Sequence, residues 1–355
     1  MKVYAVIGAN YGDEGKGLVS GCLAREANTR GEKILTVFYN GTTQRAHTFE
    51  GHVHRSMAAG TSYGSDTFYH ENFVIDPILL YIHQAKPIID GNCRVILPCD
   101  VEANRNREKG RGSERHGSCG NGLFDAVKRD RDPHCRVRVK DLFDQYNLYY
   151  KVKEINKKYE EGKDDLYNMD FFMKAVSYVI KHCRVASFRE VVQEYDTVIF
   201  EGGQGLMLDQ GNMDCFPHLT PSSTGLRGIA ADIEKLNADT QLFYVTRSYL
   251  TRHGAGPLSG ECDKDDINPD IVDGTNVHNE WQGDLRFGKI DVNRLRSRIL
   301  EDAEYIQNKR LNLVITHMNY TDNQLETVNG RTMEGLQFAD NIYASDQKDQ
   351  MSLLV

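Results

Sequence analysis

Short apolar runs alternate with amphipathic stretches along most of the chain. The runs that predict strands are Val3–Ile7, Ile34–Tyr39, Cys93–Leu97, Thr197–Phe200, Leu242–Val245 and Leu311–Ile315, each bounded by glycine or polar residues. Apolar residues at helical spacing follow Gly17 and recur in Leu142–Glu161, Leu166–Cys183 and Leu295–Ile306, with a break at Gly162. Because strands that alternate with helices form parallel sheets, we expect an α/β fold: a mainly parallel central sheet with helices on both faces.

No internal repeat or low-complexity linker divides the 355 residues, so 1–355 is predicted to be a single domain. Residues 101–140 are charged and glycine-rich, and we expect a long functional loop there.

Composition excludes several classes of protein. Apolar residues make up 40% and charged residues 26%, which is typical of a globular enzyme and not of a disordered or fibrous chain. A net charge of −8 argues against nucleic-acid binding by bulk electrostatics. No apolar run is long enough to cross a membrane, and the first residues carry no signal-peptide pattern. The eight cysteines form no C-x-x-C pair, so we expect reduced thiols and a cytoplasmic location.

The strongest local signal is the glycine-rich segment 8–17, which runs from the first strand into a helix. Such a loop presents backbone N–H groups to a phosphate. It departs from the regular phosphate-loop pattern because Asn10 stands in place of Gly, and Gly17 in place of the Ser/Thr that would hold magnesium. A carboxylate among phosphates is repelled unless a metal or a proton transfer needs it. Asp13 is therefore predicted to bind Mg²⁺, to act as a general base, or both; the alternative is a turn that Asp13 caps.

Histidines follow the second strand. His47 lies at the strand-to-loop junction and is a candidate acid toward a developing oxyanion, although a single histidine is more often structural. His52 and His54 have no third ligand nearby, so we expect solvated strand residues and not a metal site.

A second glycine-rich segment, Glu201–Gly205, follows an apolar strand, where parallel-sheet proteins bind ligands. Gln204 has a donor and an acceptor for a base or sugar edge. Thr220, Ser222 and Ser223 form a small polar loop suited to a phosphate.

In this order the segments resemble the adenylosuccinate synthetase family, which joins aspartate to C6 of a 6-oxopurine nucleotide with a nucleoside triphosphate. The matching segments are Gly12–Gly17, Ala46–Thr48, Arg138–Phe143, Glu201–Gly205, Thr220 and Thr251–Pro257. The resemblance extends from residue 1 to about 350. It implies that family's P-loop-NTPase-like fold, Mg²⁺ as cofactor, small-molecule partners and a homodimer.

The resemblance also implies a mechanism and its residues. Asp13 would withdraw the N1 proton and ligate Mg²⁺, and His47 would stabilise O6 as the γ-phosphoryl group moves onto it; the aspartate amine would then displace that group. The implied contacts are Gly12, Gly15, Lys16, Gly17, His47 and Thr48 for ATP; Asp13 and the carbonyl of Ala46 for the metal; Asp13, Gln44, Arg45, Ser118, Cys119, Gln204 and Thr220 for the purine nucleotide; and Asn276, Trp281, Gln282, Gly283 and Arg286 for aspartate.

One departure from the family pattern concerns the phosphoryl donor. Residues 316–319 read Thr-His-Met-Asn where the family has Thr-Lys-x-Asp, whose Asp reads the guanine of GTP. Asn319 has one acceptor and one donor and suits adenine, so it predicts ATP or dATP as donor. The alternative is that Asn319 caps a strand end and that another residue reads the base.

Other departures concern the acceptor. Segments 117–122 and 43–45 are remodelled, Arg286 alone remains of several loop arginines, and residues 345–347 stand where the family has a Ser-x-Gly-Pro segment. The candidates for an arginine that crosses the dimer interface are Arg129, Arg131 and Arg136.

This combination resembles the phage-type branch, the N6-succino-2-amino-2′-deoxyadenylate synthases. It implies a dGMP–aspartate ligase that uses ATP or dATP and works in a host cytoplasm. The alternatives are an adenylosuccinate synthetase acting on IMP with GTP, and a nucleotide-binding regulator without catalysis.

Overall fold

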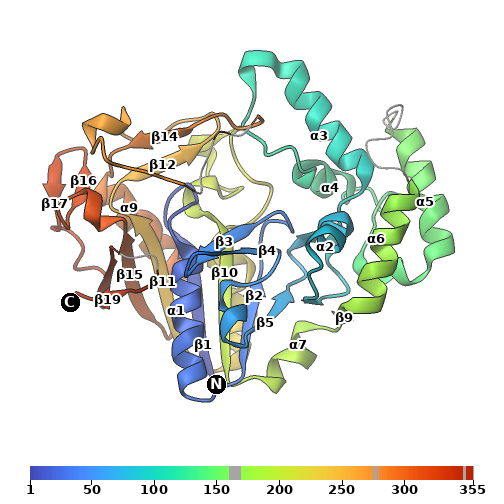
Figure 1. Cartoon of the computed structure of the whole chain (residues 1–355), viewed down its shortest axis with the longest axis horizontal. Helices are drawn as coiled ribbons and strands as arrows, with labels where there is room; N and C mark the ends of the chain where they lie inside the picture. Colours follow the sequence, from blue (N-terminus) through green and yellow to red (C-terminus); the bar gives the residue numbers. More distant parts are fainter. Residues whose placement is uncertain (160–168, 275–277, 279, 347–348, 355) are drawn as a thin grey trace.

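A central sheet forms the middle of the molecule in the computed structural model (Figure 1). The structure describes residues 1–159, 169–274, 278, 280–346 and 349–354. In this part of the chain the sheet has ten strands in the order β19-β18-β15-β11-β1-β10-β2-β5-β7-β9. All neighbours are parallel except β18 and β19. The predicted fold class is confirmed. The strands are β1 Lys2–Gly8, β2 Ile34–Phe38, β5 Asp66–Tyr69, β7 Ile88–Ile89, β9 Arg184–Val185, β10 Thr197–Gly205, β11 Asp239–Arg247, β15 Arg310–Thr316, β18 Asn341–Ser345 and β19 Ser352–Leu353.

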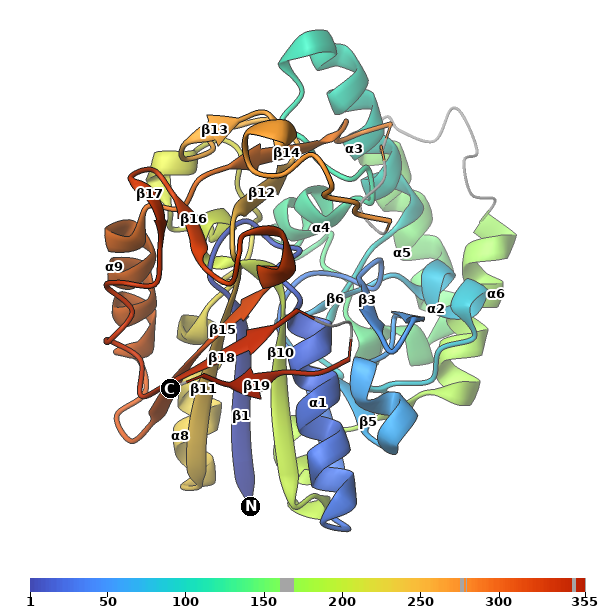
Figure 2. The ribbon, with the colours of Figure 1, turned by 60° about the vertical axis from the view of Figure 1, so that its left-hand side comes forward.

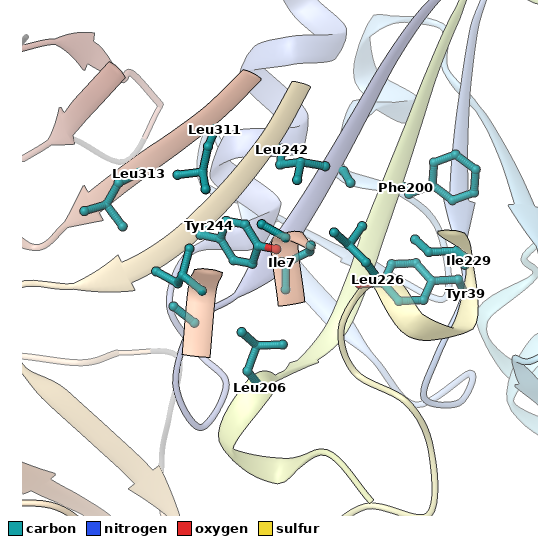
Figure 3. Packing of buried hydrophobic residues seen from close by; sticks show 14 of the residues in the cluster. Ile7, Tyr39, Phe200, Leu206, Leu226, Ile229, Leu242, Tyr244, Leu311 and Leu313 are labelled. Atoms are coloured by element: carbon teal, nitrogen blue, oxygen red, sulfur yellow. The ribbon is translucent and has the colours of Figure 1, made fainter. Parts of the chain in front are cut away.

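Helices cover both faces because the strand residues that point to either face are apolar. In β1, Val3, Ala5 and Ile7 pack in the cluster of α8 and α9, whereas Tyr4 and Val6 pack in that of α1 (Figures 2 and 3). Helices α2, α5 and α6 pack beside β5 and β7 at one end of the sheet. The helices are α1 Lys16–Thr29, α2 Pro77–His83, α3 Pro98–Arg111, α4 Leu123–Arg129, α5 Gln145–Lys158, α6 Met169–His182, α7 Phe188–Val191, α8 Ala230–Leu236 and α9 Val292–Ala303. None of the helices within the described ranges has the length and apolar character to cross a membrane.

Small sheets lie beyond the carboxyl ends of the parallel strands. The hairpin β3–β4 follows β2, and the antiparallel sheet β12-β14-β13 follows β11 (Figure 1). Two short pairs, β6–β8 and β16–β17, complete the described strands. Their bounds are β3 Ala46–Phe49, β4 His52–Arg55, β6 Val74–Ile75, β8 Arg94–Val95, β12 Leu250–His253, β13 Glu261–Cys262, β14 Leu285–Gly288, β16 Leu325–Thr327 and β17 Gly330–Thr332.

Two expectations from the sequence are corrected. Residues 101–140 are not one long loop, because α3 and α4 take up much of them; Glu, Arg and Lys are good helix formers, and charge alone does not separate a helix from a loop. Cys93–Leu97 contributes only β8, which pairs with β6 outside the central sheet. All eight cysteines are free thiols, as expected.

Asp302, near the end of α9, is a buried carboxylate that joins three elements of the core. Its Oδ2 accepts a hydrogen bond from the Tyr244 hydroxyl at 2.9 Å, and its Oδ1 accepts one from the Leu226 backbone N–H at 2.9 Å. Tyr244 and Leu226 are part of the packed cluster in Figure 3. Burial raises the pKa of Asp302 to about 6.

This raised pKa predicts a pH dependence of stability. The folded pKa lies above the unfolded value of about 3.9, so the carboxyl group stabilises the fold at low pH, and that contribution is lost as pH rises toward and through 6. When the pH is raised from 4 to 7, the unfolding free energy of the natural protein should fall by about 2 kcal/mol more than that of Asp302→Asn. Urea unfolding of both proteins across this range measures the difference. Parallel stability curves would contradict the prediction.

Candidate active site

The loop between β1 and α1 is folded around its own glutamate. Glu14 Oε1 accepts hydrogen bonds from the backbone N–H groups of Asn10 (3.1 Å) and Gly12 (2.8 Å), and Glu14 Oε2 lies 2.6 Å from Lys16 Nζ. The side chains of Glu14 and Lys16 are each only 2% exposed. Lys16, which was predicted to bind a phosphate, is therefore paired with a carboxylate, and loop N–H groups already hold an anionic group.

Two glycines are required for this loop geometry. Gly15 caps α1 with φ near +100°, a conformation that side chains disfavour. A Cβ at Gly17 would lie 2.4 Å from His47 Cβ, so glycine is needed for the close approach of α1 to β3. This contact explains the absence of a Ser/Thr at position 17.

The same loop is fastened to the ends of β11 and β15. Arg247 Nε donates to the carbonyl oxygen of Asp13 at 2.7 Å, and its Nη2 lies 2.8 Å from Asp273 Oδ2. The Thr316 hydroxyl donates to the carbonyl oxygen of Glu14 at 2.8 Å. Sequence reasoning missed Arg247; its signal was a charged residue at the carboxyl end of a buried strand.

Asp13 presents its carboxylate to solvent. Its φ is +59°, its side chain is 42% exposed, and its carboxylate accepts no hydrogen bond from the described residues. The alternative that Asp13 caps the helix is not found, because α1 has Gly15 as its N-cap and no side-chain cap. The imidazole of His253, at the end of β12, lies beside it, with Nε2 3.8 Å from Asp13 Oδ2.

His47 on β3 is held by a buried carboxylate from β10. Glu201 is fully buried, and its Oε1 lies 2.6 Å from His47 Nδ1 and 2.9 Å from Arg45 Nη2. The Ser20 hydroxyl of α1 lies 2.5 Å from Glu201 Oε2. Sequence reasoning singled out the segment of Glu201 but not its contact with His47.

The charges of this pair follow from its surroundings. Burial by itself would raise the pKa of Glu201, but His47 and Arg45 hold it down at about 2. Burial lowers the pKa of His47, and this outweighs the opposite effect of Glu201. Glu201 is thus a carboxylate that accepts the Nδ1–H of His47, which leaves Nε2 for a bound molecule.

The residues predicted to contact the purine nucleotide fall into two groups. Gln204 has a buried Oε1 without a hydrogen-bond partner among the described residues, and Thr220 is buried beside Ser222. Arg45 instead donates to Glu201 and to the Gly202 carbonyl, and its guanidinium stacks on a Phe ring. Gln204 is free to bond a ligand, whereas Arg45 supports β10.

The remaining nucleotide candidates cluster around the loop between α3 and α4. The Ser118 hydroxyl donates to Asn104 Oδ1 at 2.9 Å, and Asn121 Nδ2 donates to Gln44 Oε1 at 2.5 Å. Cys119 lies between them, half-buried, and burial raises the pKa of its thiol. Gln44 and the loop are thus joined, as the predicted shared site requires.

The segment predicted to bind aspartate is only partly described, since Asn276 lies outside the described residues. Gln282 Nε2 donates to the Gly117 carbonyl at 3.0 Å, and Gly283 has φ near +74°. Arg286 is engaged elsewhere: it bonds both carboxylate oxygens of Glu261, at 2.7 and 2.6 Å, and the carbonyls of two glycines of the 254–256 turn, at 2.9 Å each. Most of its donors are therefore used to hold that turn.

The predicted metal ligands suit magnesium. No group of three or more His, Cys, Asp or Glu that could hold a metal occurs in the described part of the chain. Magnesium, however, is commonly held by one or two carboxylates together with substrate phosphates. Asp13 has an accessible carboxylate that accepts no hydrogen bond from the residues that the structure describes, and Ala46 is exposed at the start of β3. These oxygen donors fit the ion.

The other candidates are placed as follows. Asn319 follows β15, is exposed and makes no hydrogen bond with a described residue, so capping by it is not observed. Thr48 lies half-buried on β3. His52 and His54 lie on strand β4; His52 is exposed as expected, whereas His54 is half-buried and its Nε2 has no hydrogen-bond partner among the described residues.

The prediction that Arg129 could cross a subunit interface is wrong. It is 1% exposed and bonds Asp100 and the carbonyls of Cys135 and Val95. A guanidinium with these buried partners cannot reach another subunit. Arg131 and Arg136 are exposed.

Comparison with known proteins agrees with these features. Residues 5–328 match the family model described as adenylosuccinate synthetase. The adenylosuccinate synthetase of Lactobacillus acidophilus is 28% identical over 289 residues, which cover 74% of this chain and 65% of that protein. The enzyme of Lactobacillus helveticus is 27% identical over 325 residues, covering 83% of this chain and 73% of that protein. The chain thus spans about two thirds of the length of these relatives.

Two solved structures share the fold. A fully ligated adenylosuccinate synthetase from Plasmodium falciparum aligns with a TM-score of 0.73 and 18% identity, over 90% of this chain and 77% of that one. The succinoaminodeoxyadenylate synthetase of cyanophage S-2L, bound to dGMP and to dATP as an energy donor, aligns with a TM-score of 0.65 and 16% identity. That alignment covers 99% of this chain and 95% of the phage protein.

Proposed function

The chain belongs to the adenylosuccinate synthetase family, and from this premise we propose that it is a ligase that joins L-aspartate to C6 of dGMP, with ATP or dATP as phosphoryl donor. The product would be N6-succino-2-amino-2′-deoxyadenylate, a precursor of 2,6-diaminopurine DNA. The observation that supports this choice is Asn319, which follows β15 with an exposed amide where a carboxylate would select guanine.

The alignment with the phage enzyme also supports this choice. The phage enzyme aligns over nearly the whole length of both chains, whereas the Plasmodium enzyme extends further beyond the match. The shared feature is the fold, and dGMP as substrate remains part of the proposal.

The mechanism follows from Asp13, in the loop between β1 and α1, and from His47, on β3 beside the start of α1. Asp13 would take the N1 proton of dGMP, which turns O6 into a nucleophile toward the γ-phosphorus, and ADP or dADP leaves. His47, with its Nδ1–H held by Glu201, would donate a hydrogen bond to O6 from Nε2 once the ring is also protonated there, as negative charge develops on O6. The aspartate amine then attacks C6 and forms the C6–N bond. The C6–O bond breaks, and phosphate leaves with that oxygen. Magnesium, when bound by Asp13 and the Ala46 carbonyl, would neutralise phosphate charge.

An alternative is an adenylosuccinate synthetase that acts on IMP with GTP. The curated relatives named above carry that description, which favours this reading. Asp13 and His47 would serve both reactions, because IMP and dGMP are both 6-oxopurine nucleotides.

The test is aspartate-dependent phosphate release with Mg²⁺, with dGMP, GMP and IMP each combined with ATP and GTP. Release confined to dGMP with ATP would support the proposal. Release with IMP and GTP would favour the alternative. Nucleotide binding without any aspartate-dependent release would indicate a non-catalytic protein.

Exchange of Asn319 for Asp should shift the donor preference toward GTP. A carboxylate accepts two guanine N–H groups and mispairs with adenine, so the ratio of kcat/KM for ATP over GTP should fall by roughly 10-fold or more. Asn323→Asp, on the same loop, adds the same charge and should leave the ratio unchanged. An unchanged ratio in Asn319→Asp would show that another residue reads the base.

A homodimer and a cytoplasmic location remain predictions. Of the three arginines considered for the interface, the exposed Arg131 and Arg136 stay candidates to reach a second subunit. Light scattering of the purified protein would measure its oligomeric state.

A further inference from the structure

Three cationic side chains surround the single tryptophan of the chain. The Cζ atoms of Arg105 and Arg115 each lie 5.8 Å from the centre of the Trp281 ring, and Lys109 Nζ lies 6.0 Å from it. Arg105 and Lys109 are four residues apart on α3 and therefore share one face of that helix. Arg115 comes from the loop that follows.

These cations are not neutralised by the part of the protein that the structure describes. None of the three has a carboxylate within ion-pair distance there. Arg105 Nε donates to the Gly120 carbonyl at 3.1 Å, and Arg115 Nη1 to the Glu280 carbonyl at 3.0 Å. Arg115 Nε is buried and has no hydrogen-bond partner in the described ranges. Like charges that converge on one aromatic ring repel one another, and an anion bound between them would relieve that repulsion.

We propose that Arg105, Lys109 and Arg115, the cation cage, bind the two carboxylates of the dicarboxylic amino-acid substrate against the ring of Trp281. This assignment rests on the proposed ligase function and names residues for one of its substrates. Planar guanidinium groups pair with carboxylates in two-point contacts, and an indole ring offers apolar surface to a methylene group. Arg286 supplies no comparable site, because Glu261 and the 254–256 turn already occupy it.

The cation cage is connected to the proposed purine site, as the site of a second substrate should be. Gln282, next to Trp281, donates to the Gly117 carbonyl. Gly117 packs so tightly on Gly254 that a Cβ there would lie 2.7 Å from Gly254 Cα. Gly254 follows His253, whose imidazole faces Asp13. A short series of contacts thus joins the cage to the carboxylate that would activate the purine.

The test uses Trp281 as its own reporter, since no other tryptophan is present. The full-length protein, loaded with dGMP and a non-hydrolysable ATP analogue, is titrated with L-aspartate, succinate, L-asparagine and inorganic phosphate at constant ionic strength. We expect a saturable fluorescence change with L-aspartate and succinate, and none with L-asparagine, which lacks the second carboxylate. Phosphate should neither reproduce the signal nor compete with L-aspartate at equal concentration.

Variants locate the effect. Arg115→Gln should raise the dissociation constant for L-aspartate at least 10-fold, and Arg105→Gln combined with Arg115→Gln at least 100-fold, while the KM of each nucleotide changes less than 2-fold. Lys153→Gln, an exposed change of the same charge on α5, should behave like the natural protein. Thermal melting confirms that each variant is folded.

Two outcomes would contradict the proposal that the cation cage binds the dicarboxylic substrate. One is an unchanged L-aspartate affinity in the folded double variant. The other is a parallel rise of the dGMP KM, or competition by inorganic phosphate, which would assign the cage to a nucleotide phosphate. Failure of the ligase proposal is distinguishable, because it abolishes aspartate-dependent phosphate release in the natural protein whereas the titrations still report on dicarboxylate binding.

Discussion

Asp13→Asn is expected to lower turnover by roughly 10³-fold or more while the protein remains folded. Asparagine has nearly the same shape and tolerates the left-handed backbone that Asp13 adopts at φ +59°, so the loop should keep its geometry. The amide cannot take a proton from N1 and is a poorer magnesium ligand. Aspartate-dependent phosphate release at saturating substrates measures the loss.

A second measurement separates the chemical step from binding. In the absence of aspartate, reversible 6-phosphoryl formation would scramble ¹⁸O from the βγ bridge of ATP, and Asp13→Asn should abolish this exchange. Asp265→Asn, a change at an exposed aspartate on another loop, serves as control and should keep both activities. Near-normal exchange in folded Asp13→Asn would remove Asp13 from the role of base.

Glu201→Gln should have the next largest effect, a fall in kcat of roughly 10²- to 10³-fold. The Glu201 carboxylate accepts the Nδ1–H of His47 and favours any positive charge that the ring takes up as O6 becomes anionic. A neutral amide binds either ring tautomer and stabilises no such charge. The KM for nucleotides should change far less than kcat, because the fully buried Glu201 carboxylate contacts His47, Arg45 and Ser20.

The control for this variant removes a different partner of the same carboxylate. Ser20→Ala deletes the hydroxyl 2.5 Å from Glu201 Oε2 but leaves the contact with His47, and kcat should fall only a few-fold. Glu201→Gln also leaves Arg45 with a weakened partner, so thermal melting must accompany the kinetics. Wild-type turnover in a folded Glu201→Gln protein would show that His47 is positioned by something else.

Local patterns along the chain predicted many of the helices and strands of the fold. Alternating apolar runs and helical spacing identified β1, α1, β2, β10, β11, α9 and β15, because each pattern reflects burial of one element against its neighbours. The glycine-rich loop and the acidic residue within it were also visible, since backbone conformation at Gly15 and the chemistry of Asp13 depend on residue type. The stretch of α3 and α4 was misread, because charged residues serve helices and loops alike.

Pairings between distant residues came only from the tertiary structure. His47 meets Glu201, and Asp13 meets Arg247, because β2, β10, β1 and β11 are neighbours in the sheet and end at the same edge. The sequence by itself determined the parallel α/β fold, the loop and the two candidate catalytic side chains, because these depend on local periodicity and residue chemistry. Only the tertiary structure decided which charges are neutralised: Lys16 and Arg286 are paired with carboxylates, whereas the cation cage around Trp281 has no carboxylate partner in the described part of the chain. Such pairing depends on which elements the fold brings together, and no local pattern records it.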